Sequence, residues 1–288
     1  MADDKKADPA SGGKIAFQGA PGAYSELAAR RHAPDLEPLP CPTFEAAFEA
    51  VHSGEAERAM LPIENSLAGR VSDIHRLLPD SGLHIIAEYF LPIEHNLIVR
   101  PEANLETIKV VRSHVMALDQ CRDTIKELGL QPEVAADTAG AAKWLADYGG
   151  PEDAAIASSR AAEIYGLKIA KPNIEDADHN MTRFLEMSET PQDAAPEDAP
   201  VITSFVFQVR NIPAALYKAL GGFATNGVNM TKLESYQLEG SFNATRFYAD
   251  AEGHPQEQSM QLALEELSFF SSSFKILGVY KAARGRES

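Results

Sequence analysis

The chain has 288 residues, of which 44% are hydrophobic, and its 26 basic and 42 acidic side chains give a formal net charge of −16. This size and composition are those of a globular protein with two or three domains and a sizeable core. An acidic surface repels phosphate backbones and anionic lipid, which argues against nucleic-acid and membrane-surface roles but leaves small anionic ligands open. The sequence also has no apolar run close to the ~20 residues of a membrane helix.

The N-terminal segment and the two cysteines indicate the compartment. Residues 1–13 are polar and lack the apolar core of a signal peptide, so we expect a disordered leader. Cys121 shares an apolar helical face with Leu118 and Ile125 and is expected to be buried. Because Cys41 is the only other cysteine in the sequence and no metal-type spacing occurs, we expect a protein of the reducing cytoplasm without a bound metal.

The first part of the chain alternates short apolar segments with polar junctions. Strands are predicted at residues 14–17, 59–63 and 83–90. A glycine- and proline-rich loop follows the first strand and offers backbone N–H groups to an anion, and Ser25 is expected to cap the next helix. An amphipathic helix is predicted to open at Thr43. The second strand is expected to stop at residues 64–66, which open another helix.

A second set of the same kind follows. Strands are predicted at residues 95–99, 108–111, 134–136 and 154–157, with helices over residues 115–128, after Thr138 and after Ser158. This alternation predicts parallel sheets covered by helices, with ligands at the polar junctions beyond the carboxyl ends of the strands. The two sets join near residues 90–98 and the chain returns near 170–187, so we expect residues 14–189 to form two lobes with a cleft between them.

The return crossing contains Thr182, Arg183 and Phe184 at the start of a predicted strand. These side chains supply a hydroxyl, a planar fork that fits a carboxylate, and an apolar wall. A small, partly apolar carboxylate would use such a trio. The same residues also fit a loop threonine, a surface arginine and a core phenylalanine, and their position facing the expected cleft favours the functional interpretation.

The composition changes after Glu189. Residues 190–200 contain three prolines and three acids and are predicted to be a linker. Residues 201–282 follow the order β-α-β-β-α-β of a ferredoxin-like α+β domain, with Pro213 starting the first helix, a hairpin turn at Glu239-Gly240, and a tail over 283–288. That fold by itself says little about function.

Five short motifs together resemble those of prephenate dehydratases that carry a C-terminal ACT regulatory domain. They are Gly19-Ala20-Pro21-Gly22-Ala23-Tyr24-Ser25, Pro62-Ile63-Glu64-Asn65-Ser66, Ser113-His114 with Gln120-Cys121, Thr138-Ala139, and Asn180-Met181-Thr182-Arg183-Phe184. The resemblance covers residues 14–280. It implies a two-lobed α/β catalytic domain similar to type II periplasmic binding proteins, with the active site in the cleft. It further implies conversion of prephenate to phenylpyruvate, water and carbon dioxide in phenylalanine biosynthesis, without metal or organic cofactor.

The resemblance assigns roles to the residues. Thr182 assists departure of the ring hydroxyl as a hydrogen-bond or proton donor. Arg183 either binds a substrate carboxylate or pairs with an acid to hold its strand, and Phe184 is a wall of the site or core. The polar lining of the site is expected to comprise Ser25, Glu64, Asn65, Ser66, Ser113, His114, Gln120, Thr138 and Asn180. The remaining histidines, such as His32, His52, His75 and His84, are expected at the surface.

In the ACT domain the sequence departs from the family pattern. Pro213-Ala214-Ala215-Leu216 has alanine where glycine is usual, and Glu234-Ser235-Tyr236-Gln237 has tyrosine and glutamine where arginine and proline are usual. We nevertheless expect L-phenylalanine to bind between ACT domains of a homodimer or homotetramer and to inhibit. The expected contacts are Ala214, Ala215, Leu216, Asn226, Asn229, Leu233, Glu234 and Ser235.

Two other functions fit the same sequence. Arogenate is the amino counterpart of prephenate. An enzyme that distinguishes the two needs to differ in only one polar contact, so an arogenate dehydratase is the nearest alternative. A non-catalytic, amino-acid-sensing binding protein is the alternative from another class, and the hydroxyl of Thr182 argues against it because binding alone does not require that group.

Overall fold

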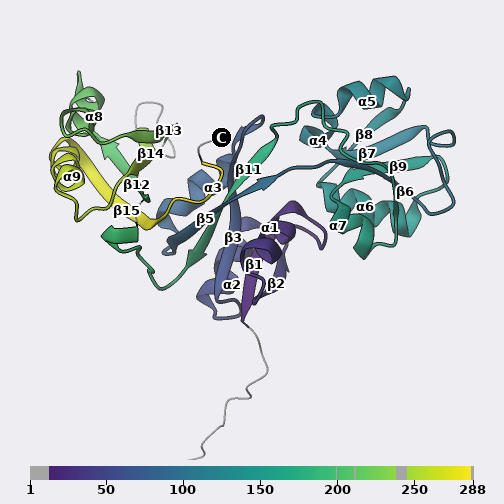
Figure 1. Cartoon of the computed structure of the whole chain (residues 1–288), viewed down its shortest axis with the longest axis horizontal. Helices are drawn as coiled ribbons and strands as arrows, with labels where there is room; N and C mark the ends of the chain where they lie inside the picture. The colour runs from purple at the N-terminus through teal and green to yellow at the C-terminus, as the bar shows by residue number, and fades with distance from the viewer. Residues whose placement is uncertain (1–12, 199, 211, 238–244, 287–288) are drawn as a thin grey trace, which may run out of the picture.

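The structure is a computed structural model that describes residues 13–198, 200–210, 212–237 and 245–286. Residues 1–12 of the expected leader, the expected turn at Glu239-Gly240 and the last two residues of the tail lie outside the described residues. Figure 1 shows three units in a row, with two α/β lobes at the centre and right and a C-terminal domain at the left. No helix in the described ranges is long and apolar enough to cross a membrane.

The first lobe is built around a six-stranded sheet in the order β2-β1-β3-β11-β5, with β4 paired to β3. Its strands are β1 (Lys14–Gln18), β2 (Glu37–Cys41), β3 (Arg58–Asn65), β4 (Gly69–Arg70), β5 (His84–Pro92) and β11 (Met181–Ser188). Its helices are α1 (Tyr24–His32), α2 (Phe44–His52), α3 (Ser72–Leu77) and the 3₁₀ turn η1 (Leu78–Asp80).

The second lobe has a five-stranded sheet in the order β10-β6-β9-β7-β8. Its strands are β6 (Asn96–Val99), β7 (Val110–His114), β8 (Gln131–Ala135), β9 (Asp153–Ala157) and β10 (Lys168–Lys171). Its helices are α4 (Val115–Asp119), α5 (Arg122–Glu127), α6 (Thr138–Tyr148) and α7 (Ser159–Ile164). Cys121 lies in the core of this lobe, as predicted.

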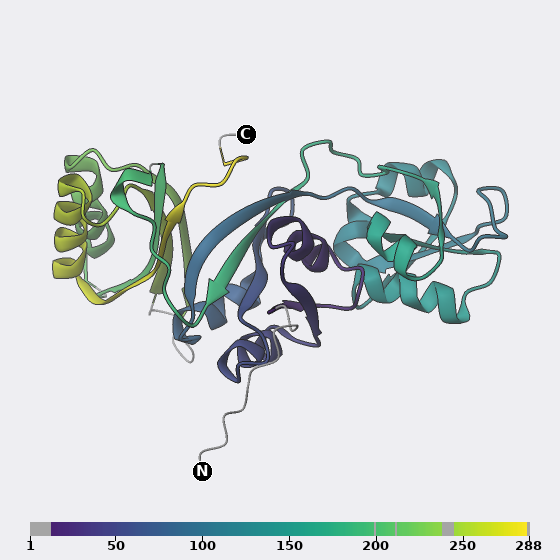
Figure 2. The ribbon, with the colours of Figure 1, turned by 60° about the horizontal axis from the view of Figure 1, so that its bottom comes forward.

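Both sheets are mixed, whereas the alternation of strands and helices predicted parallel ones. β1 pairs in parallel with β2 and β3, but β11 runs antiparallel to β3 and β5. In the second lobe, β6 and β10 are antiparallel to their neighbours. The reason is topological, because β5 leaves the first lobe toward the second and β11 returns along it (Figure 2).

Three local predictions differ from the structure. Ser25 does not cap α1, because the helix begins at Tyr24 after Ala23, which makes no side-chain cap bond. The helix expected over 115–128 is interrupted after Asp119, and the Asp176 carboxylate accepts from the N–H groups of Arg122 and Asp123 where α5 begins. Residues 64–66 do not open a helix, since β3 runs to Asn65 and turns into β4.

The C-terminal domain has an antiparallel sheet in the order β13-β14-β12-β15, which is the ferredoxin-like arrangement predicted. After the 3₁₀ turn η2 (Pro196–Asp198), its elements are β12 (Val201–Val209), α8 (Ala215–Thr225), β13 (Met230–Gln237), β14 (Thr245–Glu252), α9 (Gln258–Phe270) and β15 (Ser271–Lys281). α8 starts two residues later than predicted, because Ala214 adopts a left-handed conformation with φ 62°.

The two faces of this sheet are buried against different partners. Phe205 and Phe207 of β12 pack with α8 and α9 in a core of their own. Ile202 and Val206, which alternate with them, join Tyr248 and the core of the first lobe. The approach is closest at Gly278 of β15, where an added Cβ would lie 2.0 Å from the carbonyl oxygen of Ile85. The C-terminal domain is therefore packed on the first lobe through a continuous apolar core.

His75 lies in this domain boundary, although it was expected at the surface. Its ring is 2% exposed and meets Tyr248 edge-on at 5.1 Å between centroids. Neither ring nitrogen has a hydrogen-bond partner among the described residues. Burial lowers the pKa of His75 to about 4, against an opposite influence of Glu234 and Glu64, while Lys232 and Arg70 add to the lowering. The folded protein therefore requires a neutral His75.

We predict that His75→Phe makes the protein less sensitive to acid. The unfolded chain binds a proton at His75 near pH 6.5, above the folded pKa, so the stability that the neutral ring confers is complete above about pH 6.5 and is lost as the pH falls toward 4. The melting temperature should therefore decrease less between about pH 7.5 and about pH 5 in this variant than in the wild type. His179→Gln changes a largely exposed histidine and is the control: its melting temperature should decrease as much as that of the wild type. Equal decreases in all three proteins would contradict the prediction.

Candidate functional site

A cavity of about 450 Å³ lies where the two lobes meet. Its polar lining comes from both lobes and from the segment that joins them. From the predicted set it contains Ser25, Asn65, His114, Gln120, Thr138, Thr182 and Phe184. Gln18, Tyr24, His95 and Asp137 add polar groups, and an apolar wall is formed by Phe44, Pro62, Val71, Ile93 and Met116 together with Phe184.

The hydroxyl of Thr182 is oriented by Asn65. The amide nitrogen of Asn65 donates to Thr182 Oγ1 (2.9 Å) and also lies 2.8 Å from Asn180 Oδ1. The amide oxygen of Asn65 accepts from the backbone N–H groups of Leu67 and Ala68, which fixes the orientation of the amide. Since Oγ1 already accepts a hydrogen bond from an amide, the proton of Thr182 is available to donate into the cavity.

A chain of side-chain hydrogen bonds continues from Asn180 across the site. Asn180 Nδ2 donates to Gln120 Oε1 (2.9 Å), which also lies 2.9 Å from His95 Nε2. His95 Nδ1 in turn lies 2.8 Å from the hydroxyl of Tyr24. Burial lowers the pKa of His95 and raises that of Tyr24 well above its ordinary value. At neutral pH both groups are therefore uncharged and act as hydrogen-bond partners.

Sequence reasoning did not select Tyr24 or His95. Tyr24 lies inside one of the motifs, and His95 begins a predicted strand, so the signals were present without a reason to choose them. The reason is tertiary, because the two residues are 71 positions apart and meet only when the chain crosses between the lobes.

The glycine-rich loop holds the two lobes together at one edge of the cavity. Ser158 Oγ donates to the carbonyl oxygen of Gly22 (2.6 Å) and Tyr165 donates to that of Pro21 (2.8 Å). Gly22 has φ +93°, and an added Cβ would lie 2.7 Å from Ala161 Cα. Glycine is therefore required at this position for both its conformation and the close contact.

Two helix N-termini border the cavity, one from each lobe; that of α1 has no side-chain cap, whereas that of α6 is capped by the carboxylate of Asp137. α1 begins at Tyr24 and α6 at Thr138, and both residues line the cavity. The first N–H groups of a helix have no partner within it, and the helix dipole favours negative charge there. The described residues that line the cavity include no lysine or arginine. The lining also includes one carboxylate, that of Asp137, which accepts from the N–H of Gly140 in the first turn of α6. Any anion bound here is therefore held by backbone N–H groups and by side chains other than lysine and arginine.

Arg183 points away from this cavity, which corrects the expectation that it binds a substrate carboxylate. Successive side chains of a strand point to opposite faces, so Thr182 and Phe184 face the cavity and Arg183 faces the C-terminal domain. Its guanidinium is 3% exposed and contacts Glu88 Oε2 at 2.8 Å and Asp250 Oδ2 at 2.6 Å. The alternative role, in which Arg183 pairs with an acid, agrees with these contacts.

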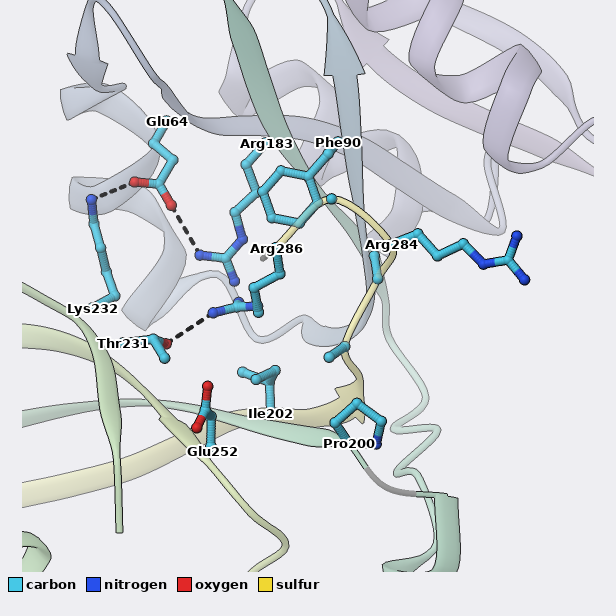
Figure 3. Close-up of a pocket in the computed structure, with 13 residues that line it drawn as sticks. Glu64, Phe90, Arg183, Pro200, Ile202, Thr231, Lys232, Glu252, Arg284 and Arg286 are labelled. Carbon is cyan, nitrogen blue, oxygen red and sulfur yellow. Dashed lines mark hydrogen bonds and ion pairs between the residues drawn. The ribbon is translucent and has the colours of Figure 1, made fainter. Parts of the chain in front are cut away.

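The side chain of Glu64, like that of Arg183, points toward the C-terminal domain. Its carboxylate lies between Arg183 and Lys232 and lines a second cavity, of about 780 Å³, at the boundary between the first lobe and the C-terminal domain (Figure 3). Burial alone would raise the pKa of Glu64, but Lys232 and Arg183 outweigh it and hold the pKa below its ordinary value. Glu64 is therefore ionised and paired in the boundary, outside the cleft cavity.

The remaining members of the predicted lining support the site from behind. Ser113 is buried and donates to the carbonyl oxygen of Ile156. Ser66 Oγ accepts from the N–H of Met181 and donates to the carbonyl oxygen of His179, which fixes the turn before β11. Asn180 is buried and connects Asn65 with Gln120. These three side chains hold the lining residues in place.

The residues expected to bind phenylalanine lie at both ends of α8, in the turn before β13 and along β13. Ala215 is buried, whereas Leu233 on the edge strand β13 is 42% exposed. Asn226 donates to the carbonyl oxygen of Gly222, and Asn229 donates to Glu252. Of the remaining members of the set, Ala214 precedes α8 and Leu216 lies in its first turn, while Glu234 and Ser235 lie on β13.

β13 also touches the first lobe. Arg70 of β4 donates to the carbonyl oxygen of Ser235 and lies 3.5 Å from the Glu234 carboxylate. Tyr236, one of the positions expected to depart from the family pattern, lies 6.3 Å from His75 between ring centroids. This tyrosine therefore lies in the domain boundary.

The fold is that of a two-lobed α/β protein, and a cavity lies between its lobes. The family profile described as prephenate dehydratase matches residues 15–192. A bifunctional N-acyl-homoserine lactone acylase/prephenate dehydratase of Komagataeibacter europaeus is 54% identical over 93% of this chain and 96% of its own length. A chloroplastic arogenate dehydratase/prephenate dehydratase of Arabidopsis thaliana is 42% identical over 93% of this chain and 71% of its own.

A solved structure agrees with these relatives. Prephenate dehydratase from Arthrobacter aurescens in complex with L-Phe is 31% identical and superposes with a TM-score of 0.87 over 94% of this chain and 90% of that one. The chain belongs to the prephenate dehydratase family.

Proposed function

We propose that the protein is a prephenate dehydratase that converts prephenate to phenylpyruvate, water and carbon dioxide. The observation that carries the proposal is the hydroxyl of Thr182, which accepts from Asn65 and can donate into the cavity between the lobes. The reaction needs such a donor because the ring hydroxyl of prephenate leaves as the ring carboxylate is lost. Membership of a dehydratase family argues against the alternative of a non-catalytic sensing protein.

The chemistry requires three things of the site. As carbon dioxide departs, its bonding electrons enter the ring and expel the hydroxyl, which takes up a proton and leaves as water. A hydrogen bond from Thr182 stabilises the charge that develops on the departing oxygen. The apolar wall around Phe184 excludes water from the carboxylate that leaves, and fixed partners hold the substrate in the reactive geometry.

The uncapped N-terminus of α1 suits one of the two carboxylates of prephenate. The start of α6 already holds the carboxylate of Asp137, so in this proposal the other substrate carboxylate is bound by polar side chains of the lining. The side chains of His114 and Gln120 complete the polar contacts. Binding an anion without lysine or arginine leaves no fixed cation to stabilise the departing carboxylate in the ground state.

The proposal is tested by incubating the purified protein with prephenate and following phenylpyruvate, with arogenate and phenylalanine release as the parallel assay. A higher kcat/KM for prephenate supports the proposal. A higher value for arogenate would replace it with the dehydratase that acts on the amino acid, and no turnover of either substrate would refute it.

We predict that Thr182→Ala abolishes turnover while KM changes little. Removing one transition-state donor costs on the order of 100-fold or more in kcat. Thr182→Ser keeps the hydroxyl and should retain most of the activity, which makes it the matched control. Steady-state kinetics on prephenate measure kcat and KM of both variants. A kcat of Thr182→Ala within a few fold of the wild-type value would contradict the role of this hydroxyl.

The C-terminal domain is proposed to be an ACT regulatory domain that binds L-phenylalanine between the subunits of a homo-oligomer. The relative from Arthrobacter aurescens was solved with L-Phe, which supports this effector. β13 is an edge strand with Leu233 exposed, so a second subunit has access to it. Glu234 is within reach of both Lys232 and Arg70 at the domain boundary, where a bound ligand would alter contacts with the first lobe.

We predict that phenylalanine inhibits the intact protein and that Leu233→Gln weakens this inhibition. The exposed leucine contributes apolar contact to the ligand or to the second subunit, and glutamine removes it. Leu262→Gln on α9, a leucine of equal exposure at 42%, is the control and should leave inhibition unchanged. Activity assays measure the inhibition, and calorimetric titration measures the binding of phenylalanine. Absence of phenylalanine binding to the wild type would refute the regulatory proposal and leave the catalytic one intact.

A second candidate activity is hydrolysis of N-acyl-homoserine lactones. The 54% identity with the bifunctional relative, over almost the full length of both chains, favours it. The test is incubation with an acyl-homoserine lactone and detection of released homoserine lactone, with Thr182→Ala as the second sample. We expect release by the wild type; a preparation active on prephenate that releases none would rule the activity out.

A further inference from the structure

A cluster of buried ionic side chains joins β11 to the C-terminal domain. The boundary cluster consists of Glu88 and Arg183 from the first lobe and Asp250, Tyr280 and Arg286 from the C-terminal domain. The side chains of Glu88 and Asp250 are fully buried, and those of Arg183 and Arg286 are 3% and 14% exposed. Two guanidinium groups thus face two carboxylates away from water.

Arg183 connects the two domains through different atoms of one guanidinium. Nε donates to Glu88 on the neighbouring strand β5, while Nη1 and Nη2 donate to Asp250 and to the hydroxyl of Tyr280 (2.9 Å). The planar fork fixes the angle between these contacts. The backbone of β11 at Arg183 is therefore held from the C-terminal domain.

Glu88 is fixed a second time by the segment that follows β15. Arg286 binds it with Nε at 2.9 Å from Oε1 and Nη2 at 2.7 Å from Oε2, and the N–H of Ala283 donates to Oε1. Figure 3 shows Arg286 directed into the boundary beside Arg183, whereas Arg284 points away from it. The segment after β15 therefore contributes an arginine that orients the acid paired with Arg183.

The cluster lies directly behind the candidate catalytic hydroxyl. Thr182 is the residue before Arg183, so their Cα atoms are about 3.8 Å apart. Catalytic groups lose effect when displaced by about 0.5 Å from the productive geometry. A change in how the C-terminal domain packs on β11 therefore alters the position of Thr182, although this domain does not contact the substrate.

We propose that Arg183 and Asp250 are positioning residues, and that their contact places the hydroxyl of Thr182 for catalysis. The inference rests on the proposed dehydratase function, because the activity it adjusts is that of Thr182. It also gives the C-terminal domain a physical route to the active site, through the backbone of β11.

The test compares two variants of β14 that each break an ion pair across the same boundary. Asp250→Asn removes the carboxylate through which the C-terminal domain pairs with Arg183, whereas Arg246→Gln breaks the pair with Asp80, which does not touch β11. We expect Asp250→Asn to lower kcat about tenfold with KM within about twofold, because positioning affects the transition state more than ground-state binding. Arg246→Gln should change neither. An unchanged kcat in folded Asp250→Asn protein would overturn the proposal.

Two further measurements separate positioning from a general loss of structure. Amide hydrogen exchange of residues 181–188 should be faster in Asp250→Asn than in Arg246→Gln, and this readout does not depend on turnover. If wild-type protein fails to convert prephenate, the proposed function fails and exchange alone decides the positioning role. If Asp250→Asn does not fold, Tyr280→Phe removes one contact of Arg183, and we expect about a threefold fall in kcat at constant KM; equal kcat there would overturn the proposal.

Discussion

The pairing of β11 with β3 on one side and β5 on the other is the constraint on which the rest of the structure depends. This strand is the return of the chain from the second lobe, so its first residues lie at the hinge between the lobes. Because strand side chains alternate, β11 presents Thr182 to the cleft and Arg183 to the C-terminal domain. A single backbone segment thus borders the cleft cavity and the domain boundary.

The two sides of β11 use opposite electrostatic arrangements. Among the described residues, the lining of the cleft cavity has no lysine or arginine and one carboxylate, that of Asp137, so an anion there can be attracted only by oriented N–H groups and polar side chains. On the other side, the arginines of the boundary cluster are balanced by Glu88 and Asp250. Burial would raise the pKa of Asp250, but Arg183 and Arg286 outweigh it and keep the pKa low. Removing one partner from such a cluster leaves a buried charge uncompensated, which is strongly destabilising.

The domain boundary combines this ionic cluster with an apolar contact. Ile202 and Tyr248 join the core of the first lobe, and Gly278 permits the backbone of β15 to approach β5. His75 is accommodated there without hydrogen bonds and remains neutral. The apolar contact buries side chains of both domains, and the ionic contacts fix the relative orientation of the domain and β11.

Local pattern in the sequence determined a large part of this protein. Apolar periodicity was sufficient for α2, with Phe44, Ala47, Phe48 and Val51 on one face, and for the alternating strand β12. The motifs also brought Asn65, His114, Thr138 and Thr182 to one expected site, and the structure places these residues around one cavity. Such elements depend on neighbours in the chain, which a sequence displays directly. β2 was missed because Pro38 and Pro40 argue against a strand, and it is tolerated only because β2 lies at the sheet edge.

Only the tertiary structure decided which way the functional side chains point. The sequence places Arg183 beside Thr182, yet the pleat directs the two to different domains. Glu64 and Asn65 are separated in the same way, and the hydrogen-bonded pair of Tyr24 and His95 forms where distant segments meet. His75 is buried because the C-terminal sheet covers it. These outcomes depend on contacts between residues that are far apart in the chain, and no local pattern of apolar and polar residues encodes which distant surface will cover a given side chain.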